Sequence, residues 1–246
     1  MSDAVVRLSR TPSVSDAVAR LSGSDYVASS ARLLAAAGAG ACGLQATVVV
    51  PAALVLGSAQ HEDDVEPSAR QRLAVVRRGT GGGAVLCDEG VLLIDLAVPR
   101  GHPLAPADVT EAYRPIGTAI VCVLQRLGVP CRTVTVAEAR AAGAAQRAAA
   151  RHACWAGLSP YEVVLADGRK LVGLAQRRRS GAVLHQIAIP VASAPRAVAA
   201  FLVAGGDVEP WLDATASLHD VPSCAALTPD QLWTELHAPL GSALAV

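Results

Sequence analysis

Lysine is almost missing from this sequence of 246 residues: Lys and Arg together number 21, and the one lysine is Lys170. An arginine can replace a lysine at most surface positions. A site that needs a compact ammonium group cannot accept the planar guanidinium. The survival of a single lysine therefore makes Lys170 a candidate for a chemical role, with chance retention as the alternative.

A net charge is also missing, because 21 acidic residues cancel the 21 basic ones. No chain-wide field attracts nucleic acid or an anionic membrane. The 52% of hydrophobic residues excludes a disordered chain. No uninterrupted apolar run approaches the roughly 18 residues of a membrane span, and Met1 to Ser15 lacks the apolar core of a signal peptide. We expect a cytoplasmic protein that binds neither nucleic acid nor membrane.

Closely spaced metal ligands and paired cysteines are absent as well. The six cysteines lie at positions 42, 87, 122, 131, 154 and 224, and none forms a Cys-x-x-Cys pair. The six histidines are far apart, and no two are separated by three or four residues. This spacing predicts reduced thiols and no metal site.

The hydrophobic pattern predicts strands that mix with helices without strict alternation. The expected strands are Thr47 to Leu56 (broken or bulged at Pro51), Leu73 to Arg77 (buried), Ala84 to Cys87, Val91 to Val98, Cys131 to Val136, Tyr161 to Leu165, Lys170 to Gln176 and Val183 to Val191. Asp167-Gly168 marks a two-residue hairpin turn. We therefore expect an α+β fold with mostly antiparallel sheets.

The expected helices are Asp25 to Ala41, Pro106 to Leu127, and residues 195–204 and 229–237. Ala137 to Ala150 fits a helix but has little apolar surface to dock. Gly205 to Pro210 suggests a soft joint, without marking a domain boundary. The prediction is one domain of residues 25–246, preceded by a frayed or helical arm of residues 1–24.

A glycine-rich segment follows the second expected strand. Arg77 to Asp88 reads RRGTGGGAVLCD. Gly81 to Gly83 allow the backbone to approach a ligand closely, and successive N–H groups can bind an anion, with Arg77 and Arg78 adding charge. The segment matches neither the phosphate-binding nor the dinucleotide-binding glycine motif. A glycine-rich hairpin turn with two solvated arginines remains the alternative.

Arg77 to Asp88 also resembles the Arg-Arg-x-Ser/Thr-Gly-Gly-Gly-Ala-Val-x-His-Asp signature of the lipoate–protein ligase A family. Gly168 to Arg177 resembles the family's Gly-x-Lys-Ile/Val-x-Gly-Ser-Ala-Gln stretch. Leu54 to Gln60 is similar to Val-Leu-Gly-x-x-Gln, and Leu184 to Gln186 to the start of Leu-His-Gln-Gly-Ser-Ile. The blocks occur in the family's order and cover about residues 50–190.

The resemblance implies an α+β fold shared with biotin–protein ligases. It implies a ligase that uses ATP and Mg²⁺ to join lipoate or octanoate to a lysine of a lipoyl domain through an acyl adenylate. Such domains occur in 2-oxoacid dehydrogenases and the glycine cleavage H protein. Lys170 would bridge carboxylate and phosphate oxygens. The resemblance assigns ligand contacts to Arg78, Gly81, Gly82, Gly83, Ala84, Val85, Leu86, Cys87, Gly173 and Ala175.

Cys154 opens a second interpretation. It resembles the acyl-accepting cysteine of the octanoyltransferase branch, in which acyl carrier protein supplies the acyl group and no ATP is needed. The Lys170 ammonium would then favour the thiolate. An ordinary buried thiol is the alternative.

Three departures from the family pattern suggest a third interpretation, a weakened relative that binds an acyl group or a partner without turnover. Cys87 replaces a histidine, and Leu174 and Ile187 replace small residues that we expect at an acyl tunnel. Both larger side chains would shorten or fill that tunnel. Arg177 to Arg179 is either a solvated hairpin end or a docking patch for an acidic lipoyl domain or carrier protein.

Overall fold

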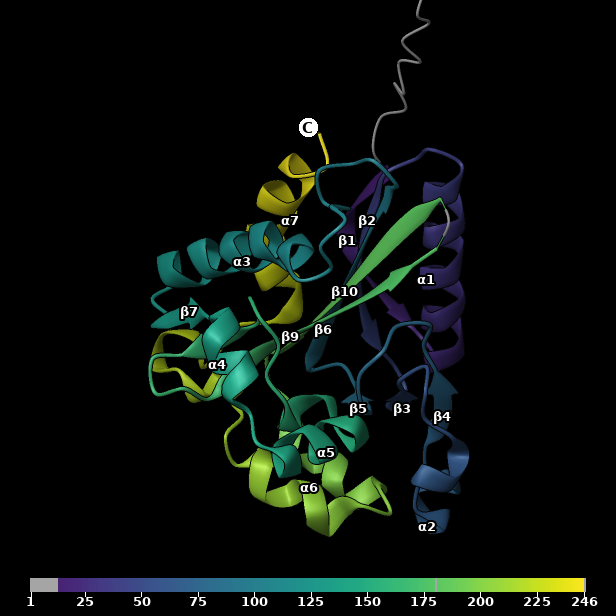
Figure 1. The fold of residues 1–246 in the computed structure, drawn as a ribbon, viewed down its shortest axis with the longest axis vertical. Coiled ribbons are helices and arrows are strands. Elements are labelled where there is room, and N and C mark those ends of the chain that lie inside the picture. Colours follow the sequence, from purple (N-terminus) through teal and green to yellow (C-terminus); the bar gives the residue numbers. More distant parts are fainter. Residues whose placement is uncertain (1–12, 180, 246) are drawn as a thin grey trace, which may run out of the picture.

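The computed structural model describes residues 13–179 and 181–245, which form two sheets flanked by helices (Figure 1). The seven-stranded sheet has the order β1 (Ser13–Leu21), β2 (Gly43–Val49), β6 (Val91–Pro99), β10 (Ala182–Pro190), β9 (Lys170–Arg178), β8 (Val163–Leu165) and β7 (Cys131–Thr133). The small sheet has the order β4 (Ala74–Arg77), β3 (Ala53–Leu56) and β5 (Val85–Cys87). Only the pairs β1–β2 and β3–β4 are parallel among these strands. The predicted α+β fold with mostly antiparallel sheets is confirmed.

Helices cover both faces of the large sheet (Figure 1). The helices are α1 (Gly23–Gly38), α2 (Pro67–Arg70), α3 (Arg114–Arg126), α4 (Val136–Ala141), α5 (Ala144–His152), α6 (Gly205–Leu212) and α7 (Pro229–Ser242). Helix α1 packs on β6 and β10, while α7 contacts β1, β2 and β6 from the opposite face and also packs on α3. The small sheet lies with α5 and α6 at one end of the molecule (Figure 1).

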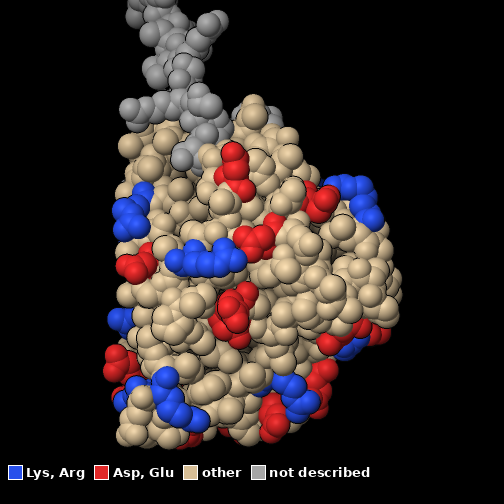
Figure 2. Space-filling model, turned by 180° about the vertical axis from the view of Figure 1, so that it is seen from behind, with Lys and Arg blue, Asp and Glu red and all other residues tan. Residues whose placement is uncertain are grey.

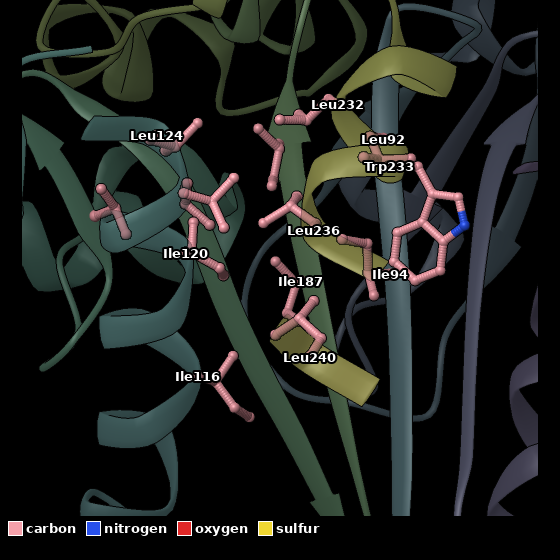
Figure 3. Packing of buried hydrophobic residues seen from close by; sticks show 14 of the residues in the cluster. Leu92, Ile94, Ile116, Ile120, Leu124, Ile187, Leu232, Trp233, Leu236 and Leu240 are labelled. Carbon is pink, nitrogen blue, oxygen red and sulfur yellow. The ribbon is translucent and has the colours of Figure 1, made fainter. Parts of the chain in front are cut away.

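The pleat of β6 and β10 gives the two faces different chemistry. Ile94 pairs with Ile187, and the next pair along the strands is Asp95 with Gln186. Because successive side chains of a strand point to opposite faces, the isoleucines face α3 and α7. They pack there in an apolar cluster with Trp233 (Figure 3). Asp95 and Gln186 face α1.

The N-terminal prediction is wrong where the structure describes that segment. Ser13–Leu21 is neither frayed nor helical but pairs as strand β1 with β2, and α7 packs against it. Val18 is buried in the resulting core. Residues 1–12 of the predicted arm lie outside the described residues.

Other element boundaries differ from the predictions for local reasons. Helix α3 begins at Arg114, because Asp108 accepts hydrogen bonds from the N–H groups of Thr110 and Glu111 and so forms a turn. The alanine-rich segment forms two helices, α4 and α5, rather than one. The expected soft joint is helix α6, and β4 is a partly exposed edge strand rather than a buried one.

Two predicted breaks are confirmed. The chain leaves the large sheet after Val49 and enters the small sheet at Ala53, so that Pro51 separates two strands. Gly168 has a φ of 90° and donates its N–H to Leu165 O, which closes the turn between β8 and β9. The longest described helix, α1, has 16 residues, and none of the described helices is long and apolar enough to cross a bilayer.

Candidate active site

Cys154 lies where the glycine-rich loop meets the end of helix α5. The Ala84 N–H donates to His152 O at 2.8 Å, and the Cys154 N–H donates back to Ala84 O at 3.1 Å. These two bonds fix the cysteine backbone against the start of β5. The Cys154 side chain is half-buried, so its thiol is held in place and remains accessible.

Glycines leave room around this thiol. A methyl group at Gly82 or at Gly173 would lie 3.8 Å from Cys154 Sγ, and one at Gly83 would lie 2.5 Å from Ala153 N. Gly82 also has a φ of 90°, which favours glycine. The N–H groups of Gly81, Gly82 and Gly83 form no hydrogen bond with the described residues. They therefore remain able to donate to an oxyanion beside the sulfur.

Arg78 holds the shape of the glycine loop. Its buried guanidinium donates from Nη2 to Gly81 O and Gly83 O, both at 2.8 Å, and from Nε to Thr80 Oγ1 at 2.9 Å. Its Nη1 donates to Val55 O at 3.1 Å. The guanidinium thus acts on the protein's own backbone, so the predicted ligand contact of Arg78 would go through the loop that it positions.

A buried polar network extends this support to the large sheet. Gln186 Oε1 accepts the hydroxyl hydrogen of Thr80, and Gln186 Nε2 donates to Asp95 Oδ1 at 2.9 Å. Asp95 also accepts hydrogen bonds from Tyr26, Ser30 and Gln45. Burial raises the pKa of the Asp95 carboxyl, and these hydrogen bonds oppose that rise. The network connects α1 and the large sheet to the loop beside Cys154.

Lys170 lies beside the cysteine segment and is almost fully buried. Its Nζ donates to Gly157 O at 2.8 Å and Cys154 O at 3.0 Å, and forms an ion pair with Glu162 Oε2 at 2.8 Å. Glu162 in turn accepts hydrogen bonds from the N–H of Leu174 in β9 and from the N–H of the loop residue Ser159. An ammonium group has three N–H bonds, so these acceptors satisfy it. Lys170 binds the carbonyl of Cys154 and fixes that segment.

Two cavities meet at Cys154. A narrow apolar one of about 30 Å³ lies between the two sheets, and a more polar one of about 270 Å³ contains Lys170, Glu162 and Gly82. The narrow cavity has only the volume of about one water molecule, so an acyl chain would enter it by displacing its walls. Cys87 borders it, and burial raises the pKa of that thiol to about 12.

Leu174 and Ile187, the larger residues that we expect at the acyl tunnel, both border the narrow cavity. They are paired across β9 and β10, and both also belong to the apolar cluster against α3 and α7. Figure 3 shows Ile187 in this cluster. The neighbouring pair Ala175 and Gln186 faces the other way. Leu174 and Ile187 therefore contribute both to the core and to one wall of the narrow cavity.

Most predicted ligand-contact residues border these cavities, and three do not. The ones that do are Arg78, Gly81, Gly82, Val85, Cys87, Gly173 and Ala175. Gly83 and Ala84 instead form the close backbone contact with residues 152–154, and Leu86 pairs with Leu54 in the small sheet. In the described part of the chain, no group of three His, Cys, Asp or Glu side chains could hold a metal ion.

Comparison with known proteins identifies the family. The sequence profile of the lipoyl protein ligase A/B catalytic domain matches residues 35–220. The chain belongs to this family. It is 37% identical over 156 residues to octanoyltransferase LipM of Kyrpidia tusciae. This match covers 62% of this chain and 55% of that protein. It is 35% identical over 138 residues to octanoyltransferase LipM of Brevibacillus brevis, with coverages of 55% and 49%. The chain thus spans about half the length of these curated relatives.

Solved structures agree on the fold. A bipartite lipoate protein ligase from Thermoplasma acidophilum superposes with a TM-score of 0.69 at 19% identity, over 96% of this chain and 85% of that one. A lipoate–protein ligase A bound with ATP superposes with a TM-score of 0.68 at 19% identity, over 92% and 85%. At this identity the likeness concerns the fold alone. The sequence match therefore shows the family, and the solved structures show the shared fold.

Sequence reasoning missed the residues that support the site. Glu162 and Gln186 were present in the matched motifs, but neither was singled out as a partner of Lys170 or of the loop. A charged residue directly before the apolar run of β8 was a usable signal for Glu162, because a buried acid needs a partner. Thr80 carried no such signal.

Proposed function

We propose that this chain is an octanoyltransferase: it takes an octanoyl group from acyl carrier protein onto Cys154 and passes it to a lysine of a lipoyl domain. The observation that carries the proposal is the accessible thiol at the junction of an apolar and a polar cavity, flanked by the unpaired N–H groups of the glycine loop. The relatives named octanoyltransferase LipM support it over the ATP-dependent ligase. The acceptor is a lipoyl domain of a 2-oxoacid dehydrogenase or of the glycine cleavage H protein.

The reaction has two acyl transfers. Cys154 Sγ attacks the thioester carbonyl of the donor, the bond from the acyl carbon to the carrier's sulfur breaks, and the cysteine proton leaves with the carrier thiol. The ε-amine of the acceptor lysine then attacks the new thioester. An amide forms, the bond to Cys154 Sγ breaks, and an amine proton returns to that sulfur. The N–H groups of Gly81 and Gly82, which border the polar cavity, would stabilise the oxyanion of each tetrahedral intermediate.

The contacts of Lys170 favour this reaction over adenylation. A ligase would need the ammonium to bridge a carboxylate and a phosphate, but Cys154 O, Gly157 O and Glu162 satisfy its N–H bonds. A transferase needs the same lysine only to hold the cysteine segment. Lys170 is therefore a positioning residue in this proposal, and ATP and Mg²⁺ are not required.

The decisive experiment is an intact-mass measurement after incubation with octanoylated acyl carrier protein and an acid quench. We expect the enzyme to gain one octanoyl group, to lose it to hydroxylamine, and to transfer it to an apo lipoyl domain without ATP. Cys154→Ala should gain nothing. The matched control is Cys122→Ser, because Cys122 is an exposed thiol on α3, and it should behave as the unmodified enzyme.

A second incubation separates the proposal from the ligase. The enzyme, MgATP, lipoate and an apo lipoyl domain are combined, and the mass of the domain is measured. We expect no change. A lipoylated domain that requires ATP and still forms with Cys154→Ala would establish the ligase and make Cys154 incidental.

A further inference from the structure

A groove of about 820 Å³ lies beside the glycine loop, outside the two cavities that meet at Cys154. One wall is a face of helix α1, and the other is formed by the start of the loop and the end of the β9–β10 hairpin. Val27, Leu34 and Leu184 give the groove an apolar floor. Neither the chemistry at Cys154 nor the packing of the sheet uses this space.

Positive charge is concentrated at this groove. Arg77, Arg78, Arg177 and Arg179 line it, and no Asp or Glu does so among the described residues. Within residues 13–179 and 181–245, none of the four forms an ion pair with a carboxylate. The chain as a whole has equal numbers of acidic and basic residues, and the two signs are intermixed on the face shown in Figure 2. The groove therefore differs from the rest of the chain, because all of its charged side chains are positive.

The glycine loop connects this groove to the thiol. Arg78 borders both the groove and the apolar cavity. The Arg177 side chain lies directly over Gly79, where a methyl group would collide with its guanidinium. The loop thus contacts the groove at Gly79 and reaches Cys154 at Gly82. A partner bound in the groove would lie next to the segment that surrounds the reactive sulfur.

We infer that this groove docks the acidic carrier protein that delivers the acyl group, an inference that rests on the proposed function. An apolar floor with a basic rim is complementary to an amphipathic acidic helix, the helix-in-groove mode of recognition. The polar cavity with Lys170 and Glu162 lies on the Cys154 side of the loop. It stays open for the lysine of the acceptor, so donor and acceptor need not share one surface.

The test compares two donors of the same octanoyl group. One is octanoylated acyl carrier protein, and the other is octanoyl-N-acetylcysteamine, a small uncharged thioester. In the double variant Arg177→Glu/Arg179→Glu we expect kcat/KM to fall on the order of 10-fold or more for the carrier protein. It should change less than about 2-fold for the small thioester, which has no charged surface to steer. Added salt should slow the unmodified enzyme with the carrier protein and leave the double variant nearly unaffected.

The control variant is Arg126→Glu, which reverses an exposed arginine on α3 outside the groove. It should change kcat/KM for neither donor. An equal loss with both donors in the double variant would overturn the inference, since it would indicate damage to the site. A raised KM for the lipoyl domain with an unchanged KM for the carrier would overturn it too, by assigning the groove to the acceptor.

A binding measurement separates the groove from the reaction. Isothermal titration calorimetry of acyl carrier protein against the enzyme requires no turnover, and the double variant should bind at least 10-fold more weakly. If the unmodified enzyme binds through the groove but never acquires an octanoyl group, the proposed function fails and the docking surface stands. If it transfers octanoate but both proteins bind the carrier equally, the docking surface fails alone.

Discussion

The two faces of the large sheet are built from the same strands but have different roles. On the α3 and α7 side, Ile94 and Ile187 belong to a large apolar cluster. On the α1 side, one residue further along each strand, Asp95 and Gln186 form a buried polar network that reaches the glycine loop. The apolar face can stabilise any arrangement of the loop, whereas the hydrogen-bonded face specifies one. We therefore expect substitutions on the first face to change stability and those on the second to change the reaction.

The largest effect on the apolar face should come from Trp233→Ala. Trp233 is 1% exposed and packs in the cluster beside Ile94 and Leu92 (Figure 3). Truncation of a buried Trp leaves a cavity and costs about 3–5 kcal/mol of unfolding free energy. Urea denaturation measures this loss, and the folded fraction should keep its rate of octanoyl transfer. Val203→Ala, at a 58% exposed position, is the control. A rate that falls in the folded fraction would contradict the separation of the two faces.

His185 lies on the same face as Ile187 and should make the stability of the protein depend on pH. Burial lowers the pKa of this histidine to about 4, and the positive charges of Arg178 and His102 add to the effect, while a hydrogen bond with Leu104 O opposes it. The unfolded chain takes up a proton near pH 6.5 and the folded chain does not. Stability is therefore full above pH 6.5 and falls by roughly 3 kcal/mol as the pH drops towards 4.

Denaturation midpoints measured across this pH range test the assignment to His185. In His185→Gln the decline should be largely lost, because the replacement does not titrate. A slope that persists in the variant would show that other groups cause the acid sensitivity.

The apolar face of the large sheet could be predicted from the sequence better than the polar face. Strand alternation and the run around Ile94 were sufficient to place an apolar core, since hydrophobic burial depends on pattern rather than on exact partners. The polar network was not predictable, because Asp95, Gln186 and Thr80 come from three distant segments and meet only through sheet register. Strand β1 was missed for a related reason: a parallel edge pair requires its partner β2 to be known.

The candidate site was predictable where local chemistry dominates. Gly82 has a positive φ, and glycines leave space beside the Cys154 thiol. These glycines belong to the motifs that the sequence already shows. The role of Lys170 was not predictable, because its ammonium contacts two carbonyls of the segment 154–157 and the carboxylate of Glu162, and these partners come together only in the fold. The rarity of lysine pointed to position 170, but it did not reveal which groups the Lys170 ammonium contacts.

Gln186→Leu tests the polar face. It should lower the unfolding free energy less than Trp233→Ala does, but it should strongly reduce the rate of octanoyl transfer. The substitution removes the acceptor of the Thr80 hydroxyl hydrogen and one of several donors to Asp95. An unsatisfied buried polar group costs about 1–3 kcal/mol. Loss of the Thr80 contact should let the glycine loop shift, and a displacement of about 1 Å can slow a reaction roughly 100-fold. Single-turnover octanoyl transfer from the Cys154 thioester measures the rate. A stability loss with an unchanged rate would make the network purely structural.

Ile187→Val is the matched change, one residue further along β10 and on the opposite face. Removal of one methylene from a 1% exposed side chain should lower the unfolding free energy by about 0.5–1.5 kcal/mol. The transfer rate should stay within about 2-fold of the unmodified enzyme. The loss of one methylene in the apolar cluster leaves intact the hydrogen bonds that hold the glycine loop, so the reacting groups should keep their positions. The same urea titrations and single-turnover assays apply to both variants. A rate loss comparable to that of Gln186→Leu would mean that core packing also positions the loop, and that the two faces act as one unit.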